Sequence, residues 1–278
     1  MRIPVISFSL EQRKFWKEVH RKRHEWKTVA QQHESLVVPV SAKTKIKLYT
    51  ASELSPHIYC GAFEWEEREW LFSHLKAEDV FFDIGANIGL FTILASEKCS
   101  KGRVIAFEPT KDTYALLDEN VKLNGSPENI TLINAAASDT NGTQDIYVLT
   151  DGRDAWNSMA VKPEEGRYRV DQIATVNVDE LVAKEDIPAP AVIKIDVEGW
   201  ELHVLRGLQK TIATHKPVML IEFTAENLKA AGASCKELAD CVHNMDYELF
   251  SYDPRYRKLR LMTDFSFEHK NLVAKPKR

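Results

Sequence analysis

From residue 80 onward, short apolar runs alternate with segments in which apolar residues recur at helical spacing. The apolar runs predict strands over residues 80–84, 103–107, 130–135, 191–195 and 218–221. The helical spacing predicts helices over residues 90–99, 112–123, 197–208 and 235–245. Such alternation is typical of a parallel sheet with helices on both faces, and strands buried on both faces are apolar throughout. The pattern therefore predicts a doubly wound, mostly parallel α/β fold, which residues 247–252 and 272–275 close with a β pair.

The first part of the chain has a different pattern. Residues 1–35 predict a charged helical arm, and residues 36–50 alternate between apolar and polar side chains like a strand. Pro39 lies in that strand and has no N–H to donate, which favours an edge position. We expect residues 1–60 to form an N-terminal arm and extension, and residues 61–278 to form the α/β domain.

A long insertion separates the third and fourth predicted parallel strands. It contains two strand-like segments, residues 145–149 and 173–178, and far exceeds the usual connection in an α/β unit. A long insertion at the carboxyl end of a parallel sheet more often has a function than not. Asp154, Trp156 and Asn157 lie in it, and we expect them to bind the acceptor substrate: Trp156 can stack on a sugar ring, while Asp154 and Asn157 bond its hydroxyls.

The net charge of −4 is small, but the charged residues are distributed unevenly along the chain. Residues 1–50 contain 11 basic residues (Lys and Arg) and 4 acidic residues, and residues 255–278 contain 8 basic and 2 acidic residues. The remaining residues, 51–254, contain 18 basic and 35 acidic residues, so an acidic body with a net charge of −17 lies between basic ends. Basic ends can attract anionic partners, but for residues 13–27 a solvated helix face is the favoured interpretation. We therefore do not expect nucleic acid as a partner.

Composition excludes several classes of protein. The 278 residues are 44% hydrophobic, with 12 Phe, 8 Tyr and 6 Trp, which excludes a mainly disordered chain. The longest apolar stretch, residues 80–95, is interrupted by Asp83 and Asn87, so we expect no membrane span. The four cysteines have neither metal-ligand nor disulfide-framework spacing. These features predict a cytoplasmic protein with reduced thiols.

The first predicted strand ends in a glycine-containing turn, Asp83-Ile84-Gly85-Ala86-Asn87-Ile88-Gly89. Glycine allows a positive φ and a close approach of ligand to backbone, and Asn87 also tolerates such a φ. Glu108 follows nineteen residues after Gly89, at the end of the second strand. A carboxylate in that place can accept both hydroxyls of a ribose.

The details of this turn favour one nucleotide over another. The dinucleotide fingerprint needs glycine where this chain has Asn87 and Leu90. Asp83 would repel a pyrophosphate but suits an ammonium group. A nucleoside attached to an amino acid satisfies every position, which predicts S-adenosylmethionine as the cofactor.

Several segments resemble one known family. The sequences DIGANIG (residues 83–89), GRVIAFEP (102–109), NAAASD (134–139), IKIDVEGWELHVLRG (193–207) and VMLIEF (218–223) are similar, in order and spacing, to FkbM-type methyltransferases of class I. The resemblance covers roughly residues 60–225. It implies a seven-stranded sheet with an antiparallel strand in its last pair.

The resemblance also implies roles for individual residues. It assigns Asp83, Gly85, Asn87 and Gly89, with Ala86 between them, to the methionine end of the cofactor. It assigns Glu108 to the ribose and the backbone around Ala136 to the adenine edge. It further implies transfer of a methyl group to a hydroxyl of a sugar-containing small molecule or glycan.

Asp196 and Glu198, after the fourth parallel strand, are the candidate catalytic residues. Methyl transfer to a hydroxyl depends on alignment of the acceptor and on a base near its oxygen, and carboxylates at this strand end are placed for that. Lys194 faces away from its apolar neighbours and is expected to pair with an acid or to bind an acidic substrate. Glu222, at the next strand end, is expected to contact the substrate.

Two alternatives remain open at this point. A magnesium ion could lie between Asp196 and Glu222, but the sequence offers no obvious third ligand, so we expect no metal. The second alternative, which only the basic ends favour, is an N-methyltransferase that acts on an amine or RNA. Enzymes that methylate nucleobase amines usually have an Asn/Asp-Pro-Pro-aromatic turn after the fourth strand, whereas this chain has Asp196-Val197-Glu198-Gly199 there. A homodimer is one option for the assembly.

Overall fold

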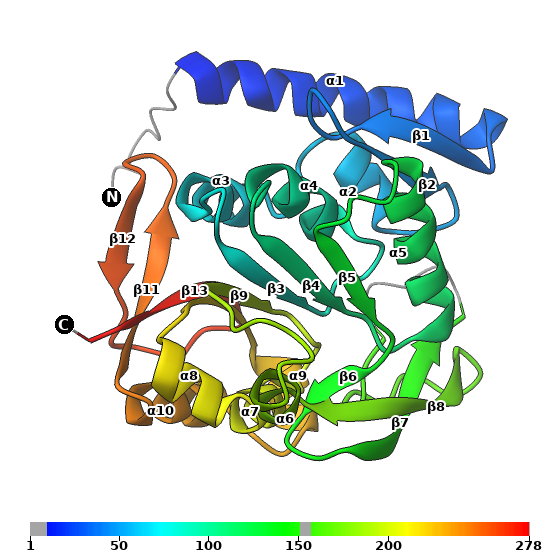
Figure 1. The fold of residues 1–278 in the computed structure, drawn as a ribbon. Coiled ribbons are helices and arrows are strands. Elements are labelled where there is room, and N and C mark those ends of the chain that lie inside the picture. The colour runs from blue at the N-terminus through cyan, green and yellow to red at the C-terminus, as the bar shows by residue number, and fades with distance from the viewer. Residues whose placement is uncertain (1–9, 151–156, 278) are drawn as a thin grey trace.

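A doubly wound sheet of eight strands forms the centre of the described chain, which covers residues 10–150 and 157–277 of a computed structural model (Figure 1). The strands are, in spatial order, β12 (Lys258–Leu261), β11 (Tyr247–Asp253), β13 (His269–Pro276), β10 (Val218–Thr224), β9 (Val192–Ile195), β3 (Val80–Ile84), β4 (Arg103–Phe107) and β5 (Ile130–Ile133). The five strands from β10 to β5 are parallel. The predicted fold class is confirmed.

The far edge of the sheet is antiparallel. β13 pairs antiparallel with both β10 and β11, with Leu249 opposite Ala274, which confirms the predicted closing pair. Seven strands were expected, but β12 folds back on β11 and adds an eighth. This short strand is largely exposed, so it lacks the apolar run that marks the buried strands.

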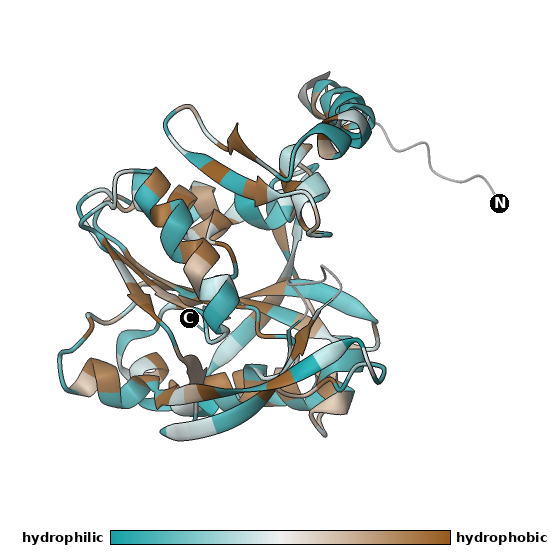
Figure 2. Cartoon of the chain, turned by 90° about the vertical axis from the view of Figure 1, so that its right-hand side faces the viewer, coloured by the Kyte–Doolittle hydropathy of each residue, from teal (hydrophilic) through white to brown (hydrophobic). Residues whose placement is uncertain are grey.

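Helices cover both faces of the sheet (Figure 1). One face carries α3 (Trp65–His74), α4 (Leu90–Lys98) and α5 (Lys111–Leu123); the other carries α6 (Val178–Ala183), α7 (Glu201–Gly207), α8 (Gln209–His215) and α10 (Cys235–Asn244). Alternation along β3 supplies both cores, because Phe81 packs with Phe91 of α4 while Phe82 packs with Val204 of α7. Apolar residues accordingly concentrate between the layers (Figure 2).

The N-terminal part packs on this body. The helix α1 (Leu10–Gln32) lies across the molecule, and Trp26 contacts the ring of Tyr59 in α2 (Ser55–Tyr59), with 5.2 Å between centroids (Figure 1). The single strand expected over residues 36–50 is instead a hairpin of β1 (Ser35–Pro39) and β2 (Lys45–Tyr49). The hairpin forms its own two-stranded sheet, in which Pro39 ends the strand.

The insertion forms a separate small sheet. Its strands are β6 (Ala136–Ser138), β7 (Gly142–Leu149) and β8 (Tyr168–Asn177), with β8 in the middle. β7 and β8 pair antiparallel, whereas β6, which directly follows β5, pairs parallel with β8. The predicted β insertion is confirmed, and it starts at the carboxyl edge of the main sheet. None of the helices in the described ranges has the length and apolar character to cross a lipid bilayer.

Candidate functional site

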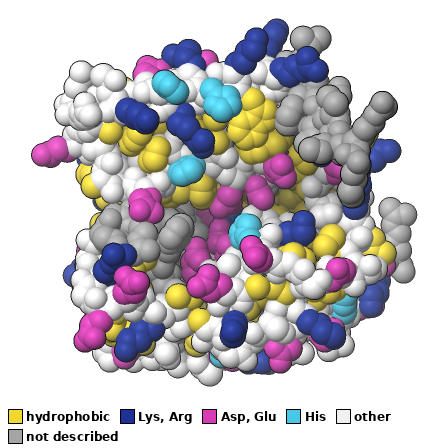
Figure 3. All heavy atoms as spheres, turned by 180° about the vertical axis from the view of Figure 1, so that it is seen from behind, with side chains coloured by type: hydrophobic (Ala, Val, Ile, Leu, Met, Phe, Trp, Pro, Cys, Tyr) yellow, Lys and Arg dark blue, Asp and Glu magenta, His cyan; other side chains and the backbone are white. Residues whose placement is uncertain are grey.

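A cavity of about 520 Å³ opens at the carboxyl ends of the parallel strands. Figure 3 shows this side of the molecule, where acidic side chains gather in a hollow. The cavity volume falls within the range of roughly 300–1,000 Å³ that is usual for small-molecule sites. Ten predicted site residues line it: Gly85, Ala86, Asn87, Glu108, Ala136, Asn157, Lys194, Asp196, Glu198 and Glu222.

The glycine turn after β3 is built for close contact between chain segments. Gly85 has a φ of +87°, and a Cβ there would lie 1.8 Å from the carbonyl oxygen of Asp196. Asn87 has a φ of +50°, as its residue type allows. Only glycine therefore lets the tips of β3 and β9 lie side by side and bring the two halves of the site together.

Glu108 connects the turn to the end of β4. Its carboxylate accepts hydrogen bonds from the backbone N–H of Asn87 (3.0 Å) and of Thr110 (2.9 Å). Burial raises the pKa of Glu108 to about 7, although these two N–H groups act in the opposite direction. The carboxyl group faces the cavity at the position expected for a ribose-binding acid.

Two residues of the predicted cofactor site do not line the cavity. Asp83 is 1% exposed and lies beneath the turn, where its carboxylate accepts a hydrogen bond of 2.6 Å from Thr92 of α4. The pleat of β3 directs Asp83 toward α4, on the same face as Phe81, rather than toward the cavity. Gly89 begins α4 with a φ of +93° and has a local structural role. The direct cofactor contacts expected of these two residues therefore stay predictions, while the other predicted cofactor residues line the cavity.

Lys194 lies among carboxylates beneath the cavity. Its Nζ is 2.5 Å from Asp196 Oδ2 and 3.7 Å from Glu64 Oε2, and it sits over the ring of Phe91. Burial opposes its charge, but Asp196, Glu64 and Asp83 outweigh that effect and raise the pKa of Lys194. Its pairing with a neighbouring acid is therefore observed, and the lysine is a buried cation.

The segment after β9 is a turn where a helix was expected. Helix α7 begins at Glu201, not at Val197, because Glu198 and Gly199 have φ values of +53° and +104°. The buried Glu201 stabilises the turn by accepting hydrogen bonds from the N–H groups of Val197 (3.3 Å) and Gly199 (3.1 Å). The turn directs Glu198 into the cavity.

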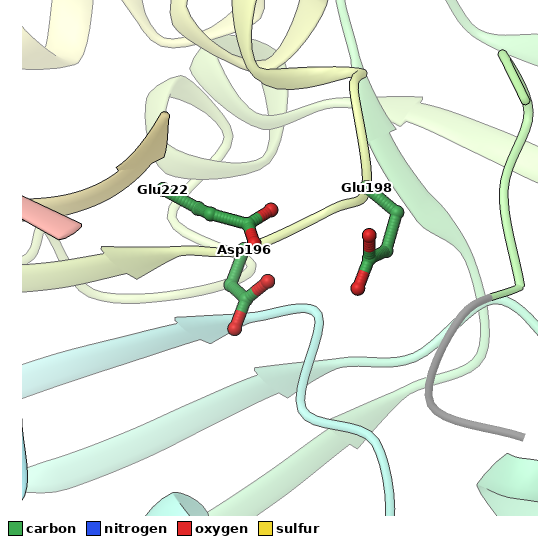
Figure 4. Close-up of side chains that lie close together, drawn as sticks. All are labelled: Asp196, Glu198 and Glu222. Carbon is green, nitrogen blue, oxygen red and sulfur yellow. The ribbon is translucent and has the colours of Figure 1, made fainter. Parts of the chain in front are cut away.

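Three carboxyl groups converge next to this turn, as Figure 4 shows. Asp196, Glu198 and Glu222 each offer an oxygen, and these oxygens all lie within 4.8 Å of one another. Glu222 was expected at a strand end but lies inside β10, whose last residue is Thr224. Burial, followed by repulsion from Asp196, raises the pKa of Glu198 to about 8 and that of Glu222 well above its ordinary value.

The segment predicted to bind the acceptor, with Asp154, Trp156 and Asn157, is described only in part. Asp154 and Trp156 lie outside the described residues, so their predicted roles stay predictions. The amide oxygen of Asn157 accepts a hydrogen bond of 2.9 Å from the backbone of Leu149, which anchors the insertion at the cavity wall. Next to it, Ser158 donates a hydrogen bond of 2.7 Å to the carbonyl of Glu198. The insertion thus contacts the turn that carries the catalytic candidates.

Sequence reasoning missed several residues that line the cavity. Glu64, which precedes α3, has one buried carboxylate oxygen without a hydrogen-bond partner in the described structure. His269 of β13 lies opposite Thr224, and its Nδ1 is 3.6 Å from Glu222 Oε1. Glu64 and His269 lie outside residues 83–222, so the motifs give no signal for them. Only the packing of α3 and the antiparallel register of β13 bring the two residues to the cavity.

The strand order and the glycine turn define a Rossmann-like fold of the methyltransferase class. A profile of the methyltransferase FkbM domain matches residues 83–249, and the chain belongs to this family. The predicted family is confirmed.

The chain is similar to several named methyltransferases over about half its length. It is 33% identical to the hexuronic acid methyltransferase AglP of Haloferax volcanii, over 51% of this chain and 55% of that protein. It is 28% identical to the methyltransferase sdnD of Sordaria araneosa, over 50% of this chain and 63% of that protein. Among solved structures, FkbM of Methylobacillus flagellatus is 18% identical with a TM-score of 0.45, over 93% of this chain and 60% of that chain. The chain thus spans about half to two thirds of these relatives.

Proposed function

We propose that the protein is an S-adenosylmethionine-dependent O-methyltransferase that methylates a hydroxyl group of a sugar-containing small molecule or glycan. The observation that carries this proposal is the cavity itself, which has Glu108 and the glycine turn on one side and the carboxylates of Asp196 and Glu198 on another. Family membership supports methyl transfer. The name of one relative, a hexuronic acid methyltransferase, supports a sugar as the acceptor.

The cavity residues fit this cofactor. Gly85 lines the cavity with backbone alone, and the buried Glu108, which also lines it, can accept hydrogen bonds from ribose hydroxyls. Since Asp83 lies beneath the turn, the ammonium group would instead meet Glu64, which lines this cavity and has a carboxylate oxygen, Oε2, that lies 3.7 Å from Lys194 Nζ and accepts no hydrogen bond from the described residues. Ala136, which is 4% exposed, lines the cavity where its backbone would meet the edge of the adenine.

The protein's own groups would act on the acceptor. When bound, S-adenosylmethionine supplies a sulfonium methyl group whose C–S bond breaks as the acceptor oxygen attacks the carbon. Asp196 or Glu198 would take the hydroxyl proton, because both carboxylates line the cavity next to the turn that approaches β3. Lys194 holds Asp196 in place from below. Orientation and proton removal are therefore the contributions we assign to this chain.

A labelled-methyl transfer screen tests the proposal. The acceptors should include neutral sugars, uronic acids and oligosaccharides, with an RNA and a small amine as the N-methylation arm. We expect transfer to at least one hydroxylated acceptor, and calorimetric binding of S-adenosylhomocysteine. Absence of S-adenosylhomocysteine binding would contradict the cofactor assignment, and transfer to the RNA or amine alone would replace O-methylation with N-methylation.

A further inference from the structure

The carboxyl groups of Asp196, Glu198 and Glu222 are held in place by neighbouring side chains, unlike acidic groups on an open surface. Each has one oxygen bound by a donor from outside the cluster. Lys194 binds Asp196 Oδ2, Asn227 donates 2.6 Å to Glu198 Oε2, and Thr224 donates 3.0 Å to Glu222 Oε1. Such outer contacts orient the ligands in metal sites. The other oxygen of each carboxylate has no such donor among the described residues and is available to bind a ligand between the three groups.

The second oxygen of Glu222 supplies an independent observation. Glu222 is 8% exposed, and its Oε2 has no hydrogen-bond partner among the described residues. Figure 4 shows the carboxyl group of Glu222 directed toward Asp196, inside the cluster. A buried carboxylate oxygen without a partner is costly. It needs either a proton or a cation.

The distances suit a hard divalent cation. Oxygen ligands lie at about 2.3–2.6 Å from Ca²⁺, so opposite ligands can be up to about 5 Å apart. The three oxygens, within 4.8 Å of one another, satisfy this limit. Around Mg²⁺, at about 2.1 Å, opposite oxygens are about 4.2 Å apart, which small side-chain rotations would reach. Charge also favours a dication, because among the described residues the one buried cation paired with this cluster is Lys194, which contacts Asp196 alone.

We propose that Asp196, Glu198 and Glu222 bind a divalent cation of the oxygen-preferring class, Mg²⁺, Mn²⁺ or Ca²⁺. The third ligand that the sequence did not reveal is Glu198, which the left-handed turn brings next to the other two. Three protein ligands leave coordination positions open to the cavity. A substrate hydroxyl bound there is held in place and loses its proton more readily. This role rests on the proposed O-methyl transfer, whereas binding of the ion does not.

Binding of Mn²⁺ to the chelator-treated protein tests the site without any substrate. Calorimetry and electron paramagnetic resonance should show one ion per chain, displaced by Mg²⁺ or Ca²⁺. Glu222→Gln should weaken Mn²⁺ binding at least tenfold. Thr224→Val removes the donor to Glu222 Oε1 and the hydrogen bond with His269 Nδ1 but keeps all three carboxylates, so it should weaken Mn²⁺ binding less. Thermal unfolding of each variant establishes that it is folded.

Glu108→Gln is the matched control, since it changes a buried carboxyl group of the same cavity outside the cluster. It should bind Mn²⁺ like the unchanged protein while binding S-adenosylhomocysteine less tightly. Equal Mn²⁺ affinity in Glu222→Gln and the unchanged protein would overturn the site. Methyl transfer that is unaffected by EDTA, in protein that binds no Mn²⁺, would overturn it and leave the proposed function intact. Mn²⁺ binding without S-adenosylhomocysteine binding would support the site and contradict the proposed function.

Discussion

Replacing Glu108 with Gln should remove a pH dependence from the stability of the protein. Glu108 is 6% exposed at the tip of β4, and its neighbours Asn87 and Thr110 donate backbone N–H groups to it. Burial raises its pKa to about 7, from an ordinary value of 4.5. Gln keeps nearly the same shape but has no proton to release in this range. The comparison therefore isolates the ionisation of one group.

The sign follows from the direction of the pKa shift. Between pH 4.5 and 7 the unfolded chain releases the proton of Glu108 while the folded chain retains it, so rising pH favours the unfolded state. The contribution of Glu108 to stability is fully present below pH 4.5 and is lost by about pH 7. At about 1.36 kcal/mol per pKa unit, the loss amounts to about 3 kcal/mol. The free energy of unfolding of the unchanged protein should fall by that amount relative to Glu108→Gln.

Urea denaturation followed by tryptophan fluorescence, from pH 4.5 to 8, measures this difference. Glu119→Gln is a suitable control, because Glu119 is a half-buried partner of Lys47 and the hydrogen bond from Lys47 lowers its pKa. Because this pKa lies below 4.5, the difference between Glu119→Gln and the unchanged protein should stay nearly constant from pH 4.5 to 8, with a slope of opposite sign only at lower pH. A difference between the unchanged protein and Glu108→Gln that stays constant from pH 4.5 to 7 would refute the assigned burial effect.

Three further substitutions probe the site. Asp196→Asn should lower methyl transfer by about 10²–10⁴-fold and leave S-adenosylhomocysteine binding nearly unchanged in calorimetry; retained turnover would refute its role as a base. Gly85→Ala should destabilise the fold by about 3 kcal/mol or more in urea denaturation, because φ is +87° and the new Cβ meets the Asp196 carbonyl; a change below about 1 kcal/mol would contradict this. Lys194→Met should cost about 3–5 kcal/mol in the same measurement, since Asp196 and Glu64 lose their buried counter-ion; unchanged stability would show that the ion pair is not needed for folding.

The regular part of the fold was predictable because its signals are local. The apolar runs at β3 and β4 and the helical spacing of α4 and α5 agree with the structure to within about two residues. The turn residues Gly85 and Asn87 were identifiable for the same reason, since a positive φ restricts residue type at the position itself. The strand end and the spacing from the turn place Glu108 next to the turn, and it lines the cavity there.

The differences arose where individual side-chain contacts, which the pattern of apolar residues does not show, decide the outcome. A helix beginning at Val197 was a reasonable expectation, but the carboxylate of Glu201 holds the preceding residues in a left-handed turn. The position of Asp83 after a strand predicts cofactor contact, which stays a prediction, and the pleat directs its carboxylate to Thr92.

The sequence by itself determined the fold class, the family, and the position of the glycine turn, because period, spacing and residue type are properties of single segments. Only the tertiary structure decided which carboxylates meet. Glu64, Glu198 and Glu222 come from a helix start, a turn and a strand interior, and they reach the cavity through packing and register across the sheet. Their charges interact through a buried space that exists only after folding, so neither the raised pKa values nor the three-carboxylate cluster could be predicted from the chain alone.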